Sequence, residues 1–136
     1  MEHDKSKHLE FIQNIINRMN TNSFQIKGWM ITIVSALLAL YASSNNYVYV
    51  FVAIVPTLIF WFIDSYYLQQ ERRFRGLYED VIKPEKNIPV FSMDISDYKQ
   101  GRYKYCRSLF SPTTAILYLI VACSLIVGGL VIIKVY

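Results

Sequence analysis

Three long blocks of apolar sequence that contain no charged residue constrain this chain more than any other feature. They are Gly28–Ala42, Tyr47–Ile63 and Thr113–Ile133. A soluble fold spreads its apolar residues with a helix or strand period, whereas a membrane span concentrates them in one run. The third block is long enough to cross about 30 Å of hydrocarbon, and the first two reach that length when flanking residues that snorkel are counted. The sequence therefore predicts an all-α membrane protein with three transmembrane helices.

Four segments follow from the apolar pattern. Apolar residues recur at three- and four-residue steps near the N-terminus, which is typical of an amphipathic helix, and the run Asn20–Ser23 is expected to end that helix. The predicted segments are a cytoplasmic amphipathic helix at 1–22, a transmembrane hairpin at 23–68 with a tight turn at 43–46, a cytoplasmic helical loop at 69–111, and a third transmembrane helix at 112–136.

The second apolar helix is expected to continue past Asp64 as one rod to about Ile82, because good helix formers follow the apolar block. Pro56 lies within it, frees the carbonyl of Val52 and should kink the rod. Thr57 or a neighbouring helix can compensate for the lost hydrogen bond. The kink is interpreted either as static or as a gating hinge.

In the loop, Asp94 begins a pattern typical of a helix start, and a short helix is predicted from there to about Ser108. Ser111 and Pro112 then form the N-cap and first helical position of the third span.

The hairpin fixes a register for the first two spans. If the hairpin folds about residues 45 and 46, two residues whose numbers sum to about 91 lie at the same depth in the membrane. Lys27 then faces Asp64. We expect an ion pair there, at the cytoplasmic interface and in contact with water, which contributes about 0 to 1 kcal/mol. Trp29 and Trp61 fall at the same depth as interface anchors.

Lys and Arg are distributed very unevenly around the spans. Four precede the first block, none lies in the turn at 43–46, nine lie between Asp64 and Ser111, and one follows the third block. By the positive-inside rule, the N-terminus and the long loop are predicted to be cytoplasmic and the C-terminus periplasmic in a bacterial inner membrane. The long polar stretch before the first block disfavours a cleaved signal peptide.

A search for catalytic chemistry finds no defensible grouping. His3 and His8 lie near an end that we expect to be mobile and lack the spacing of a metal site, and no glycine-rich phosphate loop is present. Cys106 and Cys123 differ too much in depth to form a disulfide. We expect a protein that is not an enzyme and has no metal or cofactor.

The segment from Tyr98 to Arg107 alternates cations with aromatic residues. Such a pattern can neutralise phosphates and stack bases, but contact with anionic lipid headgroups at a cytoplasmic loop is the favoured interpretation. Both an anionic nucleotide and a headgroup remain as ligands. The candidate residues are Arg72, Arg73, Arg75, Lys99, Arg102, Tyr103, Lys104, Tyr105 and Arg107.

Small residues at four-residue spacing mark helix faces that allow backbones to approach closely. They are Ser35 with Ala39, and Ser124 with Gly128 and the adjacent Gly129. Because three helices bury little against one another, we expect a homo-oligomer in the lipid bilayer. No span carries a buried charge, which disfavours ion-coupled transport and leaves hydroxyl-bearing residues such as Thr57 to line any pore.

Two parts of the first half of the chain resemble small membrane proteins that are encoded in bacterial anti-phage loci. The matching residues are 9–13, 18–20, 22–24, 27–29, 33–37, 61–68, 71–72 and 74–75. The layout of a cytoplasmic helix, a transmembrane hairpin and a helical extension also resembles SLATT-type effectors, among them the Hailong-type membrane effector. This chain departs from the two-helix SLATT pattern by its third span.

The resemblance implies an effector that breaches the inner membrane and is associated with a nucleotidyltransferase that makes a nucleotide signal. We therefore expect a homo-oligomeric pore-forming effector of abortive anti-phage defence, gated or restrained by a cyclic nucleotide or a short DNA or RNA oligomer. The alternative is a non-conducting membrane anchor or regulatory subunit for a partner protein.

Overall fold

The computed structural model describes residues 1–136, and the chain forms helices and no strand. Three helical stretches, which are α1, α2 together with α3, and α5, are long and apolar enough to cross a membrane. The predicted all-α fold with three candidate spans is therefore confirmed. The elements are α1 (Glu2–Ser44), α2 (Val48–Val52), α3 (Ile54–Ile82), a 3-10 helix η1 (Gly101–Tyr103), α4 (Tyr105–Leu109) and α5 (Pro112–Val135).

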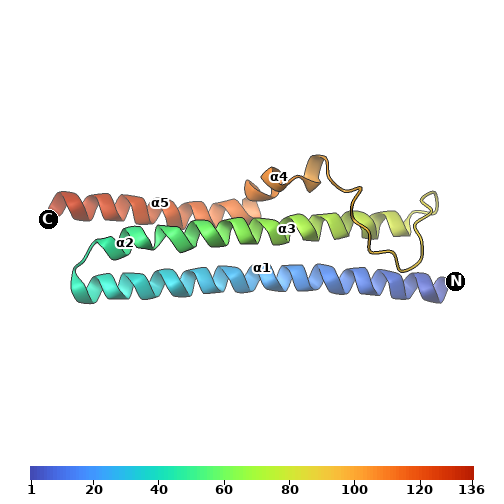
Figure 1. The fold of residues 1–136 in the computed structure, drawn as a ribbon, viewed down its shortest axis with the longest axis horizontal. Helices are drawn as coiled ribbons and strands as arrows, with labels where there is room; N and C mark the ends of the chain where they lie inside the picture. The colour runs from blue at the N-terminus through green and yellow to red at the C-terminus, as the bar shows by residue number, and fades with distance from the viewer.

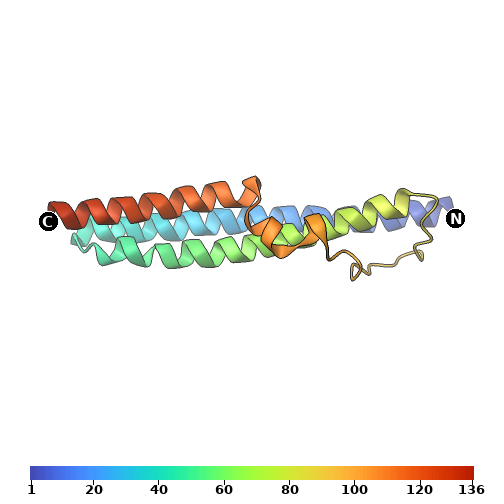
Figure 2. The same ribbon diagram turned by 90° about the horizontal axis from the view of Figure 1, so that it is seen from above.

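The molecule is an elongated rod, shown in two views in Figures 1 and 2. α1 runs antiparallel to α2 and α3 along the whole rod, whereas α5 lies beside α2 and α3 only in the half that holds the turn and the C-terminus. No Cα atom of α1 lies within 8 Å of one in α5. The three apolar helices therefore form an open arrangement around α2 and α3 rather than a closed bundle.

α1 is one uninterrupted helix of 43 residues, so the predicted helix end at Asn20–Ser23 is wrong. The hydroxyl of Thr21 donates to the carbonyl of Asn17 at 2.9 Å, and the hydroxyl of Ser23 donates to Asp64 of α3. These side chains bond within the helix or across to α3 instead of capping a new helix. The apolar contacts with α3 on both sides of this stretch hold the helix in one register.

The helical hydrogen-bond pattern between the turn and α3 is interrupted at Ala53, where α2 ends and α3 begins. This position lies three residues before Pro56, which has no N–H to offer to the carbonyl of Val52. The hydroxyl of Thr57 donates to the carbonyl of Ala53 at 2.9 Å. A kink caused by Pro56 was expected, and α2 and α3 together still form one helical stretch to Ile82 as predicted.

The loop after α3 is mostly irregular, so the predicted helix from Asp94 to Ser108 is wrong apart from the short η1 and α4. The Asp94 carboxylate accepts from the N–H of Ser96 at 2.9 Å, which closes a local turn instead of capping a helix. Gly101, the first residue of η1, has φ +64°, in the left-handed region that glycine adopts most readily. The predicted start of the third span is correct, because Ser111 is the N-cap of α5 and Pro112 its first residue.

Two apolar cores occupy the two halves of the rod. One core, at the end of the rod that holds the N-terminus and the loop, consists of Ile12, Ile16, Leu77 and Val81, and loop residues such as Ile95 pack against it. If this half lies in water, each fully buried aliphatic side chain contributes about 1.5 to 3 kcal/mol. The other core lies among the apolar helices, where lipid is as apolar as the side chains and packing geometry has to hold the helices together. Its buried members are Met30, Val34, Val50, Ala53, Trp61, Ala115, Tyr118 and Leu125.

Candidate functional site

A buried polar cluster, here called the Asp64 junction, joins all three apolar helices between the two cores. It consists of Ser23 and Lys27 from α1, Asp64 from α3 and Tyr118 from α5. Lys27 Nζ lies 2.5 Å from Asp64 Oδ2 and donates to Ser23 Oγ at 2.8 Å. The Tyr118 hydroxyl donates to Asp64 Oδ2 at 3.0 Å, and Ser23 donates to the other carboxylate oxygen. The contact between Lys27 and Asp64 agrees with the register drawn from the hairpin.

The surroundings of this ion pair differ from the expectation of a pair in water. The Asp64 side chain is 0% exposed within the chain, whereas that of Lys27 is 23% exposed. A buried carboxylate needs hydrogen-bond donors at both of its oxygens, and three donors from two other helices supply them. The expectation that no buried charge lies along the apolar helices is therefore wrong at Asp64, which directly follows the second apolar block within α3. The junction is a specific link between helices rather than a weak surface pair.

Tyr118 is a member of the junction that sequence reasoning missed. It is the only aromatic residue inside the third apolar block, at a position away from both ends where aromatic anchors belong. A lone tyrosine within an apolar run carries a hydroxyl that needs a partner when buried, and this signal points to a polar contact. It does not reveal which helix supplies the acceptor.

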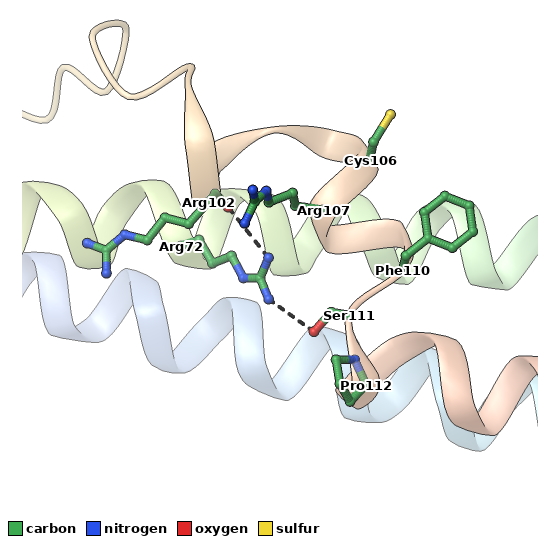
Figure 3. A pocket seen from close by; sticks show the side chains of 7 residues that line it. All are labelled: Arg72, Arg102, Cys106, Arg107, Phe110, Ser111 and Pro112. Atoms are coloured by element: carbon green, nitrogen blue, oxygen red, sulfur yellow. Dashed lines mark hydrogen bonds between the residues drawn. The ribbon is translucent and has the colours of Figure 1, made fainter.

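Beside the start of α5 lies an open cavity of about 720 Å³, here called the arginine pocket. Figure 3 shows its lining from three parts of the chain, with the guanidinium of Arg72 between η1 and the N-terminus of α5. Arg72 donates to Ser111 Oγ at 3.0 Å and to the carbonyl of Arg102 at 3.5 Å. No carboxylate lines the cavity. Its residues are Arg72, Arg102, Cys106, Arg107, Phe110, Ser111 and Pro112.

The three arginines of this pocket differ in how much of their charge is already compensated. Arg102 donates to Glu79 at 2.7 Å and its side chain points away from Ser111 in Figure 3. The hydrogen bonds to Glu79 and to the hydroxyl of Tyr103 raise the pKa of Arg102 above its ordinary value. Arg72 and Arg107 belong to none of the five ion pairs of the chain, so their charges are the ones free to meet an anion.

The remaining predicted ligand cations lie outside the arginine pocket. Arg73 donates to the carbonyl of Ile95 at 2.9 Å and so holds the loop against α3. Arg75 pairs with Glu71 one helical turn away, at 2.6 Å. Lys99 and Lys104 are exposed. The structure therefore brings together three of the seven cations that the sequence offered as ligand-binding residues.

The tyrosines of the basic segment make contacts within the chain. Tyr103 packs edge-on against Tyr98 with ring centroids 5.3 Å apart, and both rings cover Gly76 of α3. The Tyr105 hydroxyl donates to the carbonyl of Phe62 at 2.8 Å, and burial raises the pKa of Tyr105. Their half-buried rings attach the loop and α4 to α3, so they do not form a row of free rings for bases.

The small residues of the apolar helices divide into two groups. Gly129 is buried, and a Cβ there would lie 2.6 Å from the ring of Phe51, so this glycine allows contact between α5 and α2. A Cβ on Gly128 would meet nothing within 4 Å. Ser124, like Ser35 and Ala39 of α1, is exposed in the single chain. Thr57, in contrast, is fully buried, which corrects its expected place on a pore surface.

His8 also departs from the expectation of a mobile end. It is 2% exposed, and its Nε2 lies 2.7 Å from the carbonyl of Ser92. Phe91, which precedes that carbonyl, has φ +62° and lies against the rings of His8 and Phe11. The loop is thus fastened to the first turns of α1.

Comparison of the chain with protein-family models, with curated proteins and with solved structures finds no match. The function is therefore argued from the residues of the Asp64 junction, the arginine pocket and the exposed helix faces.

Proposed function

We propose that the protein is a membrane effector that assembles from several copies and opens a pore in a bacterial inner membrane. In this proposal the N-terminus and the loop face the cytoplasm, because they hold 13 of the 14 Lys and Arg residues. The resemblance to SLATT-type and Hailong-type effectors supports abortive anti-phage defence as the setting. A cyclic nucleotide or short oligonucleotide, made by a partner nucleotidyltransferase, is the proposed controlling signal.

The observation that carries the proposal is the open arrangement of the three apolar helices. At most 28% of the residues in each apolar window are buried within the chain. No Cα atom of α1 lies within 8 Å of one in α5, and each helix leaves small residues at four-residue spacing accessible. Small residues favour association of helices in lipid because they let backbones approach closely. Contact between α1 of one copy and α5 of the next is a head-to-tail interface, which closes into a ring when the rotation between copies permits.

The rival function is a non-conducting anchor or regulatory subunit, and the cytoplasmic half of the rod favours it. That half has its own apolar core and several exposed aromatic side chains, among them Phe11 and Phe91. An anchor would use this half to hold a partner protein and would need no contact between its own copies. We rank it second because it leaves the exposed small residues of α1 and α5 without a role.

Purified protein in liposomes tests the pore directly. With the signal in its permissive state, we expect dye or ion flux from liposomes that contain the protein, and candidate nucleotides and short oligonucleotides are added in turn. Gly128→Leu should abolish flux and relieve toxicity in cells, because it fills an accessible surface without touching the chain's own packing. Val127→Leu, on an exposed neighbour, is the matched control and should conduct normally.

Gly129→Leu separates packing within a chain from packing between chains. It would collide with Phe51 and should lower thermal stability, whereas Gly128→Leu should not. If the liposomes stay tight under every condition while the cytoplasmic half binds a specific protein, the pore is wrong and the anchor is correct.

A further inference from the structure

We propose that Arg72 and Arg107 form a binding site for a phosphate group at the start of α5, and that a phosphate bound there draws Arg72 away from Ser111. The site is the arginine pocket, and the chemistry of its ligand is a phosphate carried either by a phospholipid headgroup or by a molecule in solution.

The charge of the pocket selects an anion. Two of its arginines, Arg72 and Arg107, have no carboxylate partner, and no acidic residue lines the cavity. Glu79, the carboxylate partner of the third arginine of the pocket, is already held by Arg102 at 2.7 Å. An anion in the pocket would therefore meet uncompensated charge rather than displace an existing ion pair.

The donor groups suit phosphate in particular. A guanidinium offers N–H donors in a planar fork that matches two phosphate oxygens, and two guanidinium groups together can serve three oxygens. The hydroxyl of Ser111 adds a further donor at the N-cap of α5. Here the helix dipole is an addition to the two arginines and not the basis of the site.

The rim of the pocket is apolar on the side of α5. Phe110 is 67% exposed and lines the cavity together with Pro112, and Ile116 lies exposed one turn further along α5. An exposed phenylalanine beside arginines, next to an apolar helix, fits the boundary between headgroups and acyl chains. A phosphate attached to acyl chains would use both parts of this surface, whereas a solute would use only the arginines.

Occupancy of the pocket would change how α5 is attached. Arg72 at present links the carbonyl of Arg102 with the hydroxyl of Ser111, and both are neutral acceptors. Hydrogen bonds between a guanidinium and an ionised oxygen are roughly twice as strong as neutral ones, so a phosphate would compete well for these donors. The link between α3 and the N-cap of α5 is then weakened.

Cys106 gives a direct measurement of occupancy, because it is exposed and lines the pocket. The full chain is purified in a detergent that has no phosphate, and Cys106 is modified with a water-soluble neutral thiol reagent. One arm adds phosphatidylglycerol, with diacylglycerol of the same acyl chains as its control. The other arm adds inorganic phosphate or ATP, with sodium chloride at equal ionic strength as its control.

If the added compound binds the site, we expect the modification of Cys106 to become about tenfold slower when that compound is present at about ten times its Kd. Protection by phosphatidylglycerol alone assigns the site to lipid, and protection by the solutes alone assigns it to a dissolved phosphate. Arg107→Gln should remove the protection without unfolding the chain, because Arg107 makes no ion pair in the structure. Arg75→Gln, outside the pocket, should keep it. No protection in either arm, or full protection in Arg107→Gln, overturns the site.

The weakened link is tested by hydrogen exchange in the first turn of α5. The N–H groups of Thr114 and Ala115 donate to the carbonyl of Ser111 at 3.0 and 2.7 Å, and their exchange should become several-fold faster when Cys106 is protected. Unchanged exchange in the occupied state overturns the coupling. The use of this coupling in gating rests on the proposed pore, but occupancy and exchange are measured without flux, so the two proposals fail separately.

Discussion

Lys27 and Asp64 are unequal partners at the scale of single residues, because water reaches only one of them. If Lys27 is replaced by Met, a fully buried carboxylate keeps only the neutral donors Ser23 and Tyr118. If Asp64 is replaced by Asn, a partly exposed ammonium can still be hydrated, and the amide oxygen can still accept from Tyr118. We expect Lys27→Met to cost about 3 kcal/mol and Asp64→Asn about 1 to 2 kcal/mol.

Thermal unfolding in detergent, followed by the change in helical circular dichroism, measures this order. Tyr118→Phe removes one neutral donor to Asp64, and its loss of stability should be smaller than the losses for Lys27→Met and Asp64→Asn. Equal losses for Lys27→Met and Asp64→Asn would contradict the difference in burial and return the pair to the surface type expected from the sequence.

Gly76 is the residue that lets the loop lie against α3. A Cβ there would stand 2.8 Å from Tyr103 Cζ and 2.9 Å from Tyr98 Cδ1, so Gly76→Ala must displace these rings. We expect faster proteolysis of residues 83–104 although alanine is the better helix former by about 1 kcal/mol. Gly28→Ala makes the same exchange within α1 and meets nothing within 4 Å, so it should leave the cleavage rate unchanged.

Predictability at this scale depended on whether the information was local. The contact between Lys27 and Asp64 followed from two charges that bound apolar runs on either side of a short turn. Tyr118 and His8 reach partners that no local rule specifies, since 54 residues separate Tyr118 from Asp64 and 84 separate His8 from Ser92. Gly76 was missed for the same reason, because its function appears only when Tyr98 and Tyr103 are placed.

At the scale of elements, the loop after α3 is fastened by a carboxylate with a depressed pKa. Burial alone would raise the pKa of Asp80, but hydrogen bonds from Tyr98 and Lys86 outweigh it, and the pKa lies below its ordinary value of 3.8. Because the folded pKa is the lower one, the attachment is complete above about pH 3.8 and is lost as the pH falls through the folded pKa.

Pepsin cleavage of the loop at several acidic pH values measures this loss. The rate for the native chain should be slow near pH 4 and should approach that of Asp80→Asn as the pH falls further. A constant ratio between the two proteins over this range would show that Asp80 does not fasten the loop.

Helices were predicted well where apolar runs defined them and poorly where polar residues had to define their ends. The end of α3 at Ile82 and the start of α5 at Pro112 were correct because Pro84 and Pro112 act through their own backbone. The polar side chains of Asn20–Ser23 and of Asp94 belong to types that cap helices in some proteins. In others the same types form hydrogen bonds to nearby backbone or to another element. Ser23 bonds to Asp64 of α3 and Asp94 bonds locally to Ser96, and a single sequence does not show which of these contacts forms.

At the scale of the whole molecule, the topology has a direct test. Reporter fusions after Asn45 and after Tyr136 should be active in the periplasm, and a fusion after Lys86 should be active in the cytoplasm, because Lys and Arg resist translocation. Substituting Lys27 by Gln in the same fusions is a useful control, since one cation among thirteen on the inner side should not invert them. A cytoplasmic C-terminus would rule out three crossings.

α1 passes the Asp64 junction without a break, so its two ends belong to one rigid helix. The part of α1 before Ser23 is about 32 Å long at 1.5 Å per residue. If α1 tilted by about 10° about the Lys27–Asp64 contact, the N-terminal end of the helix would move by about 6 Å. The opposite end of the same rigid helix, at the turn before α2, would swing the other way. A push on the first turns of α1 would then displace the end of the helix before α2, because one unbroken helix joins the two ends.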